Sequence, residues 1–270
     1  MIFYSNAKIN LGLFITEKRK DGFHNLESLF LPVPWSDQLE IVKSEKFGFS
    51  AEGIEIEGEA QGNLCVKAYE LLQKDFDLPP VSIHLTKNIP IGAGLGGGSS
   101  NAAFTLKAVN QIFNLGLSEE QLIAYATQLG SDCTFFIRNQ PAIASGKGDI
   151  LKSVSNFKFS TYCLLVYPNL HIETRKAYEK VKPRKSKYKI AEIIQSPPES
   201  WQEKLINDFE ASLLGIYPEL NQLKNQLIEM KPSFVSMSGS GSAFYAFFKE
   251  KPSSLPIPDE YPRRIFKLAF

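Results

Sequence analysis

A run of glycines near the middle of the chain limits its fold more than any other feature. Five glycines stand within the nine residues 92–100, between a segment of strand periodicity at 81–86 and a patterned helical segment at 99–113. Glycine adopts backbone angles closed to other residues, so the N–H groups of such a loop can converge, and the following helix adds the positive end of its dipole. The sequence therefore predicts an anion cradle, which suits phosphate better than a flexible linker does.

The sequence pattern of this loop fits the known signatures of several nucleotide-binding folds poorly. Gly92, Gly94 and Gly97 match G-x-G-x-x-G, but Asn88-Ile89-Pro90 separates them from the strand, and the nearest following acids open a helix. The Gly-Lys-Ser/Thr of a P-loop and the HRD and DFG signatures of protein kinases are also missing. A dinucleotide-dependent oxidoreductase and a nucleotide-binding module without catalysis stay open as alternatives.

Hydrophobic periodicity predicts strands and helices along the whole chain. In the first half we expect strands at 8–16, 38–42 and 81–86, and helices at 64–76 behind the N-cap Asn63, at 99–113, and at 118–129 between Ser118 and Gly130. In the second half we expect a strand at 162–167, a helical region at 201–230 interrupted at Pro218, and two strands within 234–248 around a Ser/Gly turn. A change in amino-acid composition near residue 152 predicts two domains, 1–152 and 153–270.

The charge balance excludes some classes of partner. With 30 Lys+Arg against 29 Asp+Glu, the net charge of +1 provides no global field for nucleic acid or an anionic membrane. Cys65, Cys133 and Cys163 lack the spacing of a metal site, and no apolar run approaches the roughly 20 residues of a membrane span or a signal segment. We expect a soluble cytoplasmic protein that binds a small molecule, neither nucleic acid nor membrane, as a monomer or weak homodimer.

Three separated motifs resemble the GHMP small-molecule kinases. They are Ala7-Lys8-Ile9-Asn10-Leu11, the stretch Pro90 to Ser100, and Met237-Ser238-Gly239-Ser240-Gly241-Ser242, whose order spans nearly the whole chain. The resemblance implies an α+β fold of two domains, an N-terminal ATP-binding α+β domain and a C-terminal ferredoxin-like α/β sandwich, with the active site in the cleft between them. It also implies ATP-dependent phosphorylation of an alcohol with Mg²⁺.

Further details resemble one subgroup of this family. The segments AKINLGL, DGFHNLESLF and GSDCTFF are similar to those of kinases that phosphorylate the 2-hydroxyl of methylerythritol carried on cytidine diphosphate, in the non-mevalonate (MEP/DXP) route to isoprenoids. A kinase for another alcohol, of the mevalonate or homoserine type, is the alternative within the family.

The resemblance assigns roles to single residues. Asp132 matches the catalytic base that receives the hydroxyl proton, and Lys8 matches the catalytic lysine that favours the alkoxide. Without the resemblance, Asp132 would be interpreted as the N-cap of a helix and Lys8 as a solvated strand residue. The positions that match nucleotide contacts are Asn63, Lys87, Pro90, Ile91, Gly92, Ala93, Gly94, Leu95, Gly96, Gly97, Gly98, Ser99 and Ser100.

A second set of positions matches contacts to the phosphate acceptor: Asn10, Phe23, His24, Thr174 and Tyr178. Phe23 would stack on cytosine, His24 would hydrogen-bond to the base, and Tyr178 would form the other half of the clamp unless it serves core packing. Two residues depart from the family pattern, Phe23 where many members carry Tyr and Thr134 where relatives often place proline. The protein ligands of Mg²⁺ are not identified by the resemblance, although Ser99 or Ser100 is a candidate.

Overall fold

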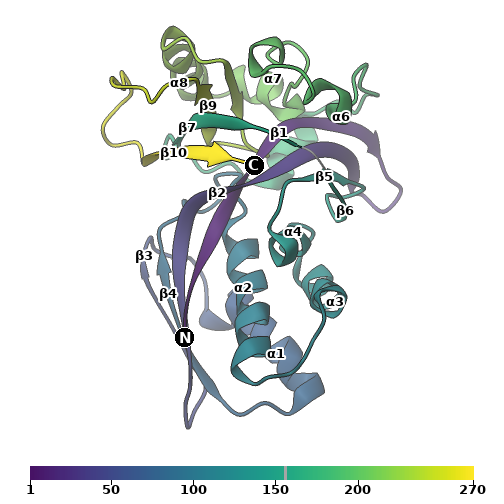
Figure 1. The fold of residues 1–270 in the computed structure, drawn as a ribbon, viewed down its shortest axis with the longest axis vertical. Coiled ribbons are helices and arrows are strands. Elements are labelled where there is room, and N and C mark those ends of the chain that lie inside the picture. Colours follow the sequence, from purple (N-terminus) through teal and green to yellow (C-terminus); the bar gives the residue numbers. More distant parts are fainter. Residues whose placement is uncertain (155–156) are drawn as a thin grey trace. The chain divides into compact units, whose positions relative to one another are not determined.

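The computed structural model describes residues 1–154 and 157–270, which fall into two compact units. Neither unit is one stretch of sequence: the first contains residues 1–7, 34–91 and 96–140, and the second contains 8–33, 92–95 and 141–270. The long strands β1 (Ile2–Lys18) and β2 (His24–Lys43) pair with each other, and each contributes residues to both units (Figure 1).

In the first unit, helices cover one side of a small sheet (Figure 1). Strand β4 (Val81–Lys87) lies between β2, which runs antiparallel to it, and β3 (Gly48–Gly53), which runs parallel. Every second residue of β4 is buried, as the period of a strand with one covered face requires. The helical elements are η1 (Ala60–Gly62), α1 (Leu64–Phe76), α2 (Gly97–Ile112), α3 (Glu119–Leu129) and α4 (Cys133–Arg138).

Local capping explains where two of these helices begin. The side chain of Asn63 accepts a hydrogen bond from the Cys65 N–H at the start of α1, and Ser118 and Gln121 form a reciprocal capping box at the start of α3. Both predicted starts are therefore confirmed. Helix α2 begins two residues earlier than predicted, because Gly96 takes the N-cap position with φ +70°.

The elements of the second unit, apart from its parts of β1 and β2, are β5 (Ala142–Ser145), β6 (Ile150–Ser153), β7 (Ser160–Val166), α5 (Thr174–Lys180), α6 (Ile190–Ile193), η2 (Pro198–Ser200), α7 (Asp208–Leu214), α8 (Pro218–Glu229), β8 (Phe234–Met237), β9 (Phe244–Phe248) and β10 (Arg263–Ala269). Antiparallel pairs build a sheet in the order β10-β7-β9-β8, and helices α7 and α8 lie on one of its faces (Figure 1). The aromatic-rich strand β9 is buried along its whole length. Strands β5 and β6 extend from the part of β2 in this unit.

The mixture of helices and largely antiparallel strands confirms the predicted α+β class, but one helical prediction is partly wrong. Residues 201–206 form turns, and α7 begins only after Asn207, whose side chain accepts a hydrogen bond from the Phe209 N–H. The predicted interruption at Pro218 is confirmed, because α7 ends at Leu214 and Pro218 starts α8, at a position where its missing N–H breaks no helical hydrogen bond. Strand β10, which pairs with β7 from Arg263 onward, was not predicted.

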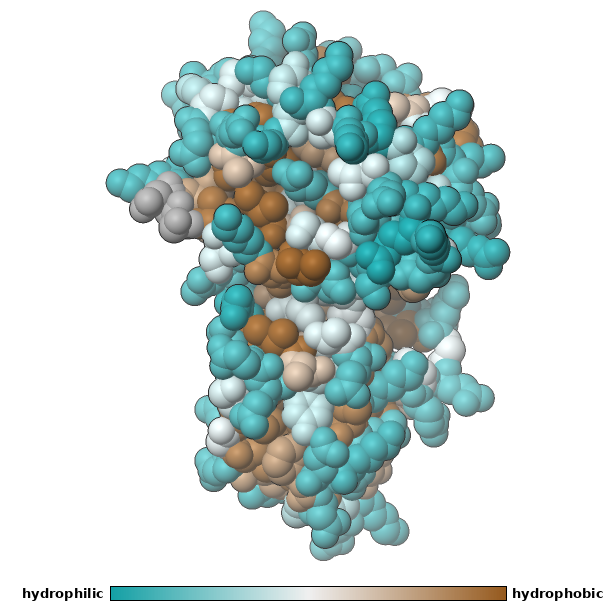
Figure 2. All heavy atoms as spheres, turned by 90° about the vertical axis from the view of Figure 1, so that its right-hand side faces the viewer, coloured by the Kyte–Doolittle hydropathy of each residue, from teal (hydrophilic) through white to brown (hydrophobic). Residues whose placement is uncertain are grey.

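Hydrophilic residues cover most of the face that Figure 2 shows, with apolar residues visible between them. Large exposed apolar side chains are scattered along the sequence, among them Tyr4, Phe23 and Ile150. Within residues 1–154 and 157–270, no helix is both long and apolar enough to cross a membrane.

A buried charged cluster fixes the end of β4 in the first unit. Asp37 accepts hydrogen bonds from the backbone N–H groups of Asn88 and Ile89 at 2.7 and 2.8 Å, and from the Asn101 side chain at 2.9 Å. It also pairs with the ammonium of Lys87, and both side chains are almost fully buried. Burial lowers the pKa of Lys87, and the charge of Asp37 opposes that effect. The pair therefore holds together backbone and side-chain groups from three segments.

Replacing Asp37 by Ala is expected to lower the free energy of unfolding by about 3–5 kcal/mol at about pH 7, because it leaves Lys87 buried without its counter-charge. Without Asp37 the folded-state pKa of Lys87 falls further below 10.5, so the unfolded chain binds more protons than the folded one. Stability then rises with pH, and the deficit should shrink between about pH 7 and about pH 9. Urea unfolding at both pH values measures it.

Glu70, exposed on α1, offers the matched control. Glu70→Gln should change stability by less than about 0.5 kcal/mol at either pH. A deficit in Asp37→Ala that stays constant or grows with pH would contradict the charge-based explanation.

Candidate active site

Lys8 and Asn10 stand two residues apart on β1 and point to the same side, as strand periodicity predicts. Lys8 is only 4% exposed, and its Nζ donates to Asn10 Oδ1 at 2.6 Å and lies 4.2 Å from the centre of the Phe30 ring. Asn10 in turn donates to the Ser28 hydroxyl at 2.9 Å. Lys8 is therefore not a solvated strand residue but a buried cation, whose attraction for an anion is stronger than in water.

The third sequence motif lies directly against the first and second ones in the second unit. The Ser238 hydroxyl accepts a hydrogen bond from the Asn10 N–H at 3.2 Å and donates one to the Gly94 carbonyl at 2.9 Å. The Lys8 N–H donates to the Leu95 carbonyl at 2.9 Å. Segments more than 80 and more than 220 residues distant from Lys8 in sequence thus meet around one buried lysine.

Glycine is required where these backbones touch. Gly94 has φ +76°, and a Cβ there would lie 2.0 Å from the Ser238 carbonyl oxygen. Gly239 has φ +56°, and its Cβ would lie 3.1 Å from the Gly94 carbonyl oxygen and 3.2 Å from Asn10 Oδ1. Two of the glycines in the motifs therefore serve close packing of the chain on itself as well as a backbone conformation.

His171 and Thr174, which follow β7 in the sequence, border the same motifs. A Cβ on Gly92 would meet the His171 ring at 1.9 Å, so this imidazole lies directly over the start of the glycine loop. The hydroxyl of Thr174, at the start of α5, lies 3.1 Å from the Ser240 hydroxyl. Thr174 was expected near the acceptor, whereas no pattern in the sequence around His171 indicates a contact with residue 92.

Two of the three residues expected to hold cytosine, His24 and Tyr178, pack together in the second unit. The rings of His24 and Tyr178 stack at 4.9 Å with 21° between their planes, and Tyr178 packs edge-on against Phe209 at 4.8 Å. Phe23 is 58% exposed, with the ammonium of Lys147 5.0 Å from its ring centre. Tyr178 therefore makes packing contacts within the second unit, and its role in a cytosine clamp stays a prediction.

The surroundings of His24 favour its uncharged form. Burial, followed by the positive charge of Lys18, lowers the pKa of this imidazole. The ring is therefore neutral at about pH 7, and it presents one donor and one acceptor nitrogen.

The start of α2 in the first unit has the features of an anion site. Gly96 is the N-cap and provides no side-chain hydrogen bond to the first turn, which leaves its N–H groups for a ligand or water. Among residues 1–154 and 157–270, the Ser100 Oγ is the buried side-chain atom without a hydrogen-bond partner. A Cβ on Gly97 would come within 2.9 Å of the Lys87 ammonium, so positive charge also lies beside this turn.

Asp132 occupies the residue before α4 but does not cap it through its side chain. It has helical backbone angles and makes no capping hydrogen bond, so the N-cap role that its residue type predicts is not what the carboxylate performs. Thr134, in the place where relatives often have proline, donates its hydroxyl to the Ser131 carbonyl at 2.8 Å and closes the turn around Asp132. Burial raises the pKa of Cys133 to about 11, which keeps it a neutral thiol.

The described part of the chain contains no cluster of three or more His, Cys, Asp or Glu side chains able to hold a metal ion. A dedicated protein cage for a cation is therefore not present in those residues.

Two family patterns and many relatives match this chain. The GHMP kinases N terminal domain matches residues 63–147, and the GHMP kinases C terminal domain matches residues 190–263. The chain is 48% identical to the 4-diphosphocytidyl-2-C-methyl-D-erythritol kinase of Bacteroides thetaiotaomicron over 96% of both chains. It is 43% identical to the protein of that name from Cytophaga hutchinsonii over 94% of both chains.

Solved structures show the same fold. A crystal structure of 4-(cytidine 5'-diphospho)-2C-methyl-D-erythritol kinase is 31% identical, with a TM-score of 0.80 over 92% of this chain and 90% of that one. Mevalonate kinase of Methanococcus jannaschii has a TM-score of 0.73 over 99% and 97% of the two chains, at 17% identity. The second likeness concerns the fold alone.

Gly94→Ala should lower the free energy of unfolding by at least about 1–3 kcal/mol, because the new methyl group meets the Ser238 carbonyl in a strained backbone conformation. Thermal and urea unfolding measure the loss. Gly98→Ala is the matched control, since a Cβ there would lie 3.8 Å from Leu64 in ordinary contact within a helix. It should leave stability unchanged or raise it by up to about 1 kcal/mol. Equal losses in both variants would contradict the close-approach argument.

Proposed function

The chain belongs to the 4-diphosphocytidyl-2-C-methyl-D-erythritol kinase family of the GHMP kinases, and from this premise we propose that it phosphorylates the 2-hydroxyl of that alcohol with ATP. The products would be ADP and the 2-phosphate, a step of the non-mevalonate route to isoprenoids. The observation that carries the proposal is the meeting of the three motifs at the buried Lys8.

The glycine-rich segment supports the assignment of ATP as the phosphoryl donor. The positive φ angles at Gly92, Gly94 and Gly96 turn the backbone sharply before α2, whose first N–H groups carry the positive end of the helix dipole. We assign the residues from Pro90 to Ser100 to the triphosphate, with Asn63 and Lys87 as neighbours of the nucleotide. Mg²⁺ would be held by the phosphates together with the hydroxyl of Ser99 or Ser100, and it would neutralise phosphate charge.

Asp132 and Lys8 are the proposed catalytic residues. Asp132 would accept the proton of the 2-hydroxyl while the hydroxyl oxygen attacks the γ-phosphorus. The bond from that phosphorus to the ADP oxygen would then break. Lys8 would stabilise the negative charge that develops on the attacking oxygen. The burial of its ammonium supports this role, because a charge in a dry site interacts more strongly than one in water.

Recognition of the cytidine group is assigned to the aromatic residues of the second unit. We propose that Phe23 stacks on cytosine, that neutral His24 hydrogen-bonds to it, and that Tyr178 contributes the second aromatic surface. Asn10 and Thr174 would contact the rest of the acceptor. Their proximity to the third motif supports this assignment.

The alternatives differ in their support. A kinase for mevalonate or a homoserine-like alcohol would share the fold, so only comparison of the alcohols as acceptors separates it from our proposal. A dinucleotide-dependent oxidoreductase requires a mainly parallel sheet, whereas β4 runs antiparallel to its neighbour β2. We further infer a cytoplasmic location, and a division into domains at about residue 152, between the two family matches.

Incubation with Mg-ATP and 4-diphosphocytidyl-2-C-methyl-D-erythritol should yield ADP and one phosphorylated product, followed by mass spectrometry. Asp132→Asn should lower kcat about 10²- to 10⁴-fold, because the amide cannot accept the proton. Its affinity for ATP should change by less than about threefold. Turnover of mevalonate or homoserine, but not of the cytidine compound, would refute the substrate assignment.

Tyr178→Ala should raise KM for the cytidine substrate by about tenfold or more, because it removes an aromatic surface from the base. KM for ATP should stay within about twofold. The control is Tyr188→Ala, a change at an exposed tyrosine in the loop after α5, which should leave both constants unchanged. An unchanged KM for the cytidine substrate in Tyr178→Ala would show that Tyr178 serves packing only.

A further inference from the structure

A short polar segment at the start of α7 connects two elements of the candidate site in the second unit. Asn207 is 4% exposed, and its side-chain NH₂ donates to the carbonyls of Met237 and Gly239, both at 2.8 Å. Its carbonyl oxygen accepts from the Phe209 N–H at 3.0 Å. One amide therefore caps a helix and holds both sides of Ser238, the residue that bridges the first and second motifs.

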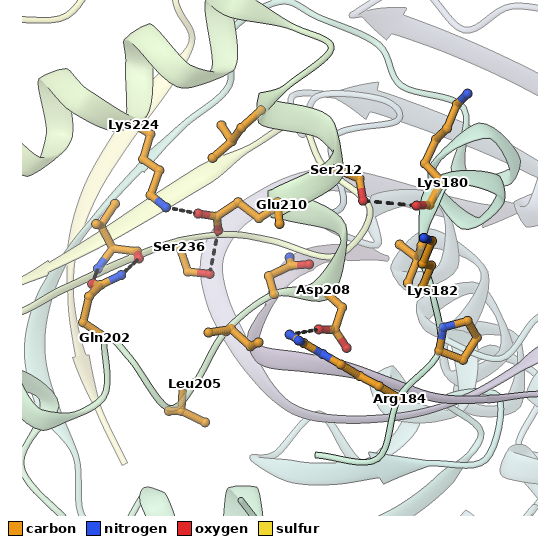
Figure 3. A pocket seen from close by; sticks show the side chains of 17 residues that line it. Lys180, Lys182, Arg184, Gln202, Leu205, Asp208, Glu210, Ser212, Lys224 and Ser236 are labelled. Carbon is orange, nitrogen blue, oxygen red and sulfur yellow. Dashed lines mark hydrogen bonds and ion pairs between the residues drawn. The ribbon is translucent and has the colours of Figure 1, made fainter. Parts of the chain in front are cut away.

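Glu210, further along α7, also holds the start of the third motif. One carboxylate oxygen accepts from the Met237 N–H at 3.0 Å and from the Ser236 hydroxyl at 3.2 Å, and the other pairs with Lys224. Figure 3 shows Glu210 pointing toward both Lys224 and Ser236. Met237 is therefore fixed at its N–H by Glu210 and at its carbonyl by Asn207.

The segment also binds strand β1, which carries Lys8. Asp208 accepts a hydrogen bond from the Ile15 N–H at 2.8 Å, and the Ile206 carbonyl accepts one from the Leu13 N–H at 2.9 Å. Asp208 is balanced on its other side by Arg184 (Figure 3). The start of α7 thus holds β1 with one set of groups and, with another, the glycine turn, residues Ser238–Ser242 of the third motif.

These contacts close a ring of hydrogen bonds around the third motif. The ring runs from β1 through residues 206–208 to the glycine turn, and from the turn back to β1 through Ser238 and Asn10. Tyr245 adds a further link, because its hydroxyl donates to the Asn10 carbonyl at 2.8 Å. The position of the turn relative to Lys8 and to the glycine loop therefore depends on Asn207 and Glu210.

The outer side of this segment borders a cavity of about 760 Å³ within the second unit (Figure 3). Four of the charged side chains that line it form two ion pairs, Glu210 with Lys224 and Asp208 with Arg184, and Lys180 and Lys182 line it as well. Gln202 lines the same cavity and makes two hydrogen bonds to the backbone of Val235, at 2.9 and 3.0 Å, on the strand that leads to the turn. Gln202 contacts neither β1 nor the turn through these bonds.

We propose that Asn207, supported by Glu210, is a positioning residue that fixes the Ser238–Ser242 turn against the phosphate loop and Lys8. The proposal rests on the proposed function, because the turn is taken to border the nucleotide in that reaction. It assigns no contact between Asn207 and a substrate. Misplacement of reacting groups by about 1 Å can cost on the order of 100-fold in rate, so the loss of this amide should affect catalysis more than stability alone explains.

The test compares two isosteric changes of an amide to a carboxylate. Asn207→Asp retains the oxygen that caps Phe209 but replaces the donor with an oxygen that repels the Met237 and Gly239 carbonyls. Gln202→Glu makes the equivalent change against the Val235 carbonyl on the same strand. Asn207→Asp should lower kcat/KM for ATP at least about tenfold, and Gln202→Glu should stay within about twofold of the wild type.

Unfolding temperatures measured on the same samples separate positioning from stability. The proposal is overturned if the two variants have equal kinetic constants, or if the loss in Asn207→Asp disappears at a temperature well below its unfolding transition. If Asn207→Asp lacks a cooperative transition, Asn207→Ser takes its place, because serine caps a helix but is too short to hold both carbonyls. It should show the same loss, and wild-type kinetics in it would overturn the proposal.

A failure of the proposed function is distinguishable from a failure of this inference. If the wild type binds ATP but does not phosphorylate the alcohol, the assignment of the acceptor fails. Calorimetric ATP affinity then tests the inference: Asn207→Asp should bind ATP at least about tenfold more weakly than Gln202→Glu. Equal affinities would overturn it.

Discussion

The close approach of backbone to backbone between Gly94 and Ser238 is the constraint on which the other features of the candidate site in the second unit depend. A carbonyl oxygen occupies the place where any other residue at position 94 would carry its Cβ. Because the two segments touch without side chains between them, the Ser238 hydroxyl can reach β1 and the glycine loop at once. Lys8 then lies beside a loop whose path is determined by packing as well as by glycine content.

Buried charges perform related tasks in the two units. In the first unit, Asp37 collects the backbone N–H groups after β4 and balances Lys87 beside the start of α2. In the second, Glu210 binds the N–H of Met237 and balances Lys224. A buried carboxylate that accepts several hydrogen bonds is costly to leave unpaired, so each holds its surroundings in one arrangement. In both cases the segment that is held borders a glycine-rich turn.

Much of the fold could be predicted from the sequence because the relevant signals are local. Asn63 and Ser118 cap their helices through contacts within a few residues, and the period of β4 shows which of its residues are buried. The prediction of helix at 201–206, the first residues of the region 201–230, was wrong because the start of α7 is set by Asn207. The amide of Asn207 also binds carbonyls some 30 residues away. Strand β10 is specified mainly by pairing with β7, about a hundred residues earlier in the chain.

The candidate site likewise combines features with local sequence signals and features that depend on long-range contacts. The motifs that contain Lys8, the glycine loop and Ser238 are visible in the sequence, and the resemblance to a family gives them roles. Their meeting, the burial of Lys8 and the contact of His171 with Gly92 depend on tertiary packing, which no local pattern encodes. The functions proposed for Asp132 and the cytosine-binding residues stay predictions until they are measured.

The stacking of His24 on Tyr178 has a consequence for selectivity. Each ring already has an aromatic partner, so an incoming base that displaces one of them exchanges one stacking contact for another and gains little from stacking itself. Its net gain must then come from hydrogen bonds to the neutral imidazole and from its own additional surface. In the proposed cytosine-binding role, the stacked partner would compete with the base, which would disfavour flat ligands that offer only a ring and favour a base whose polar edge matches His24.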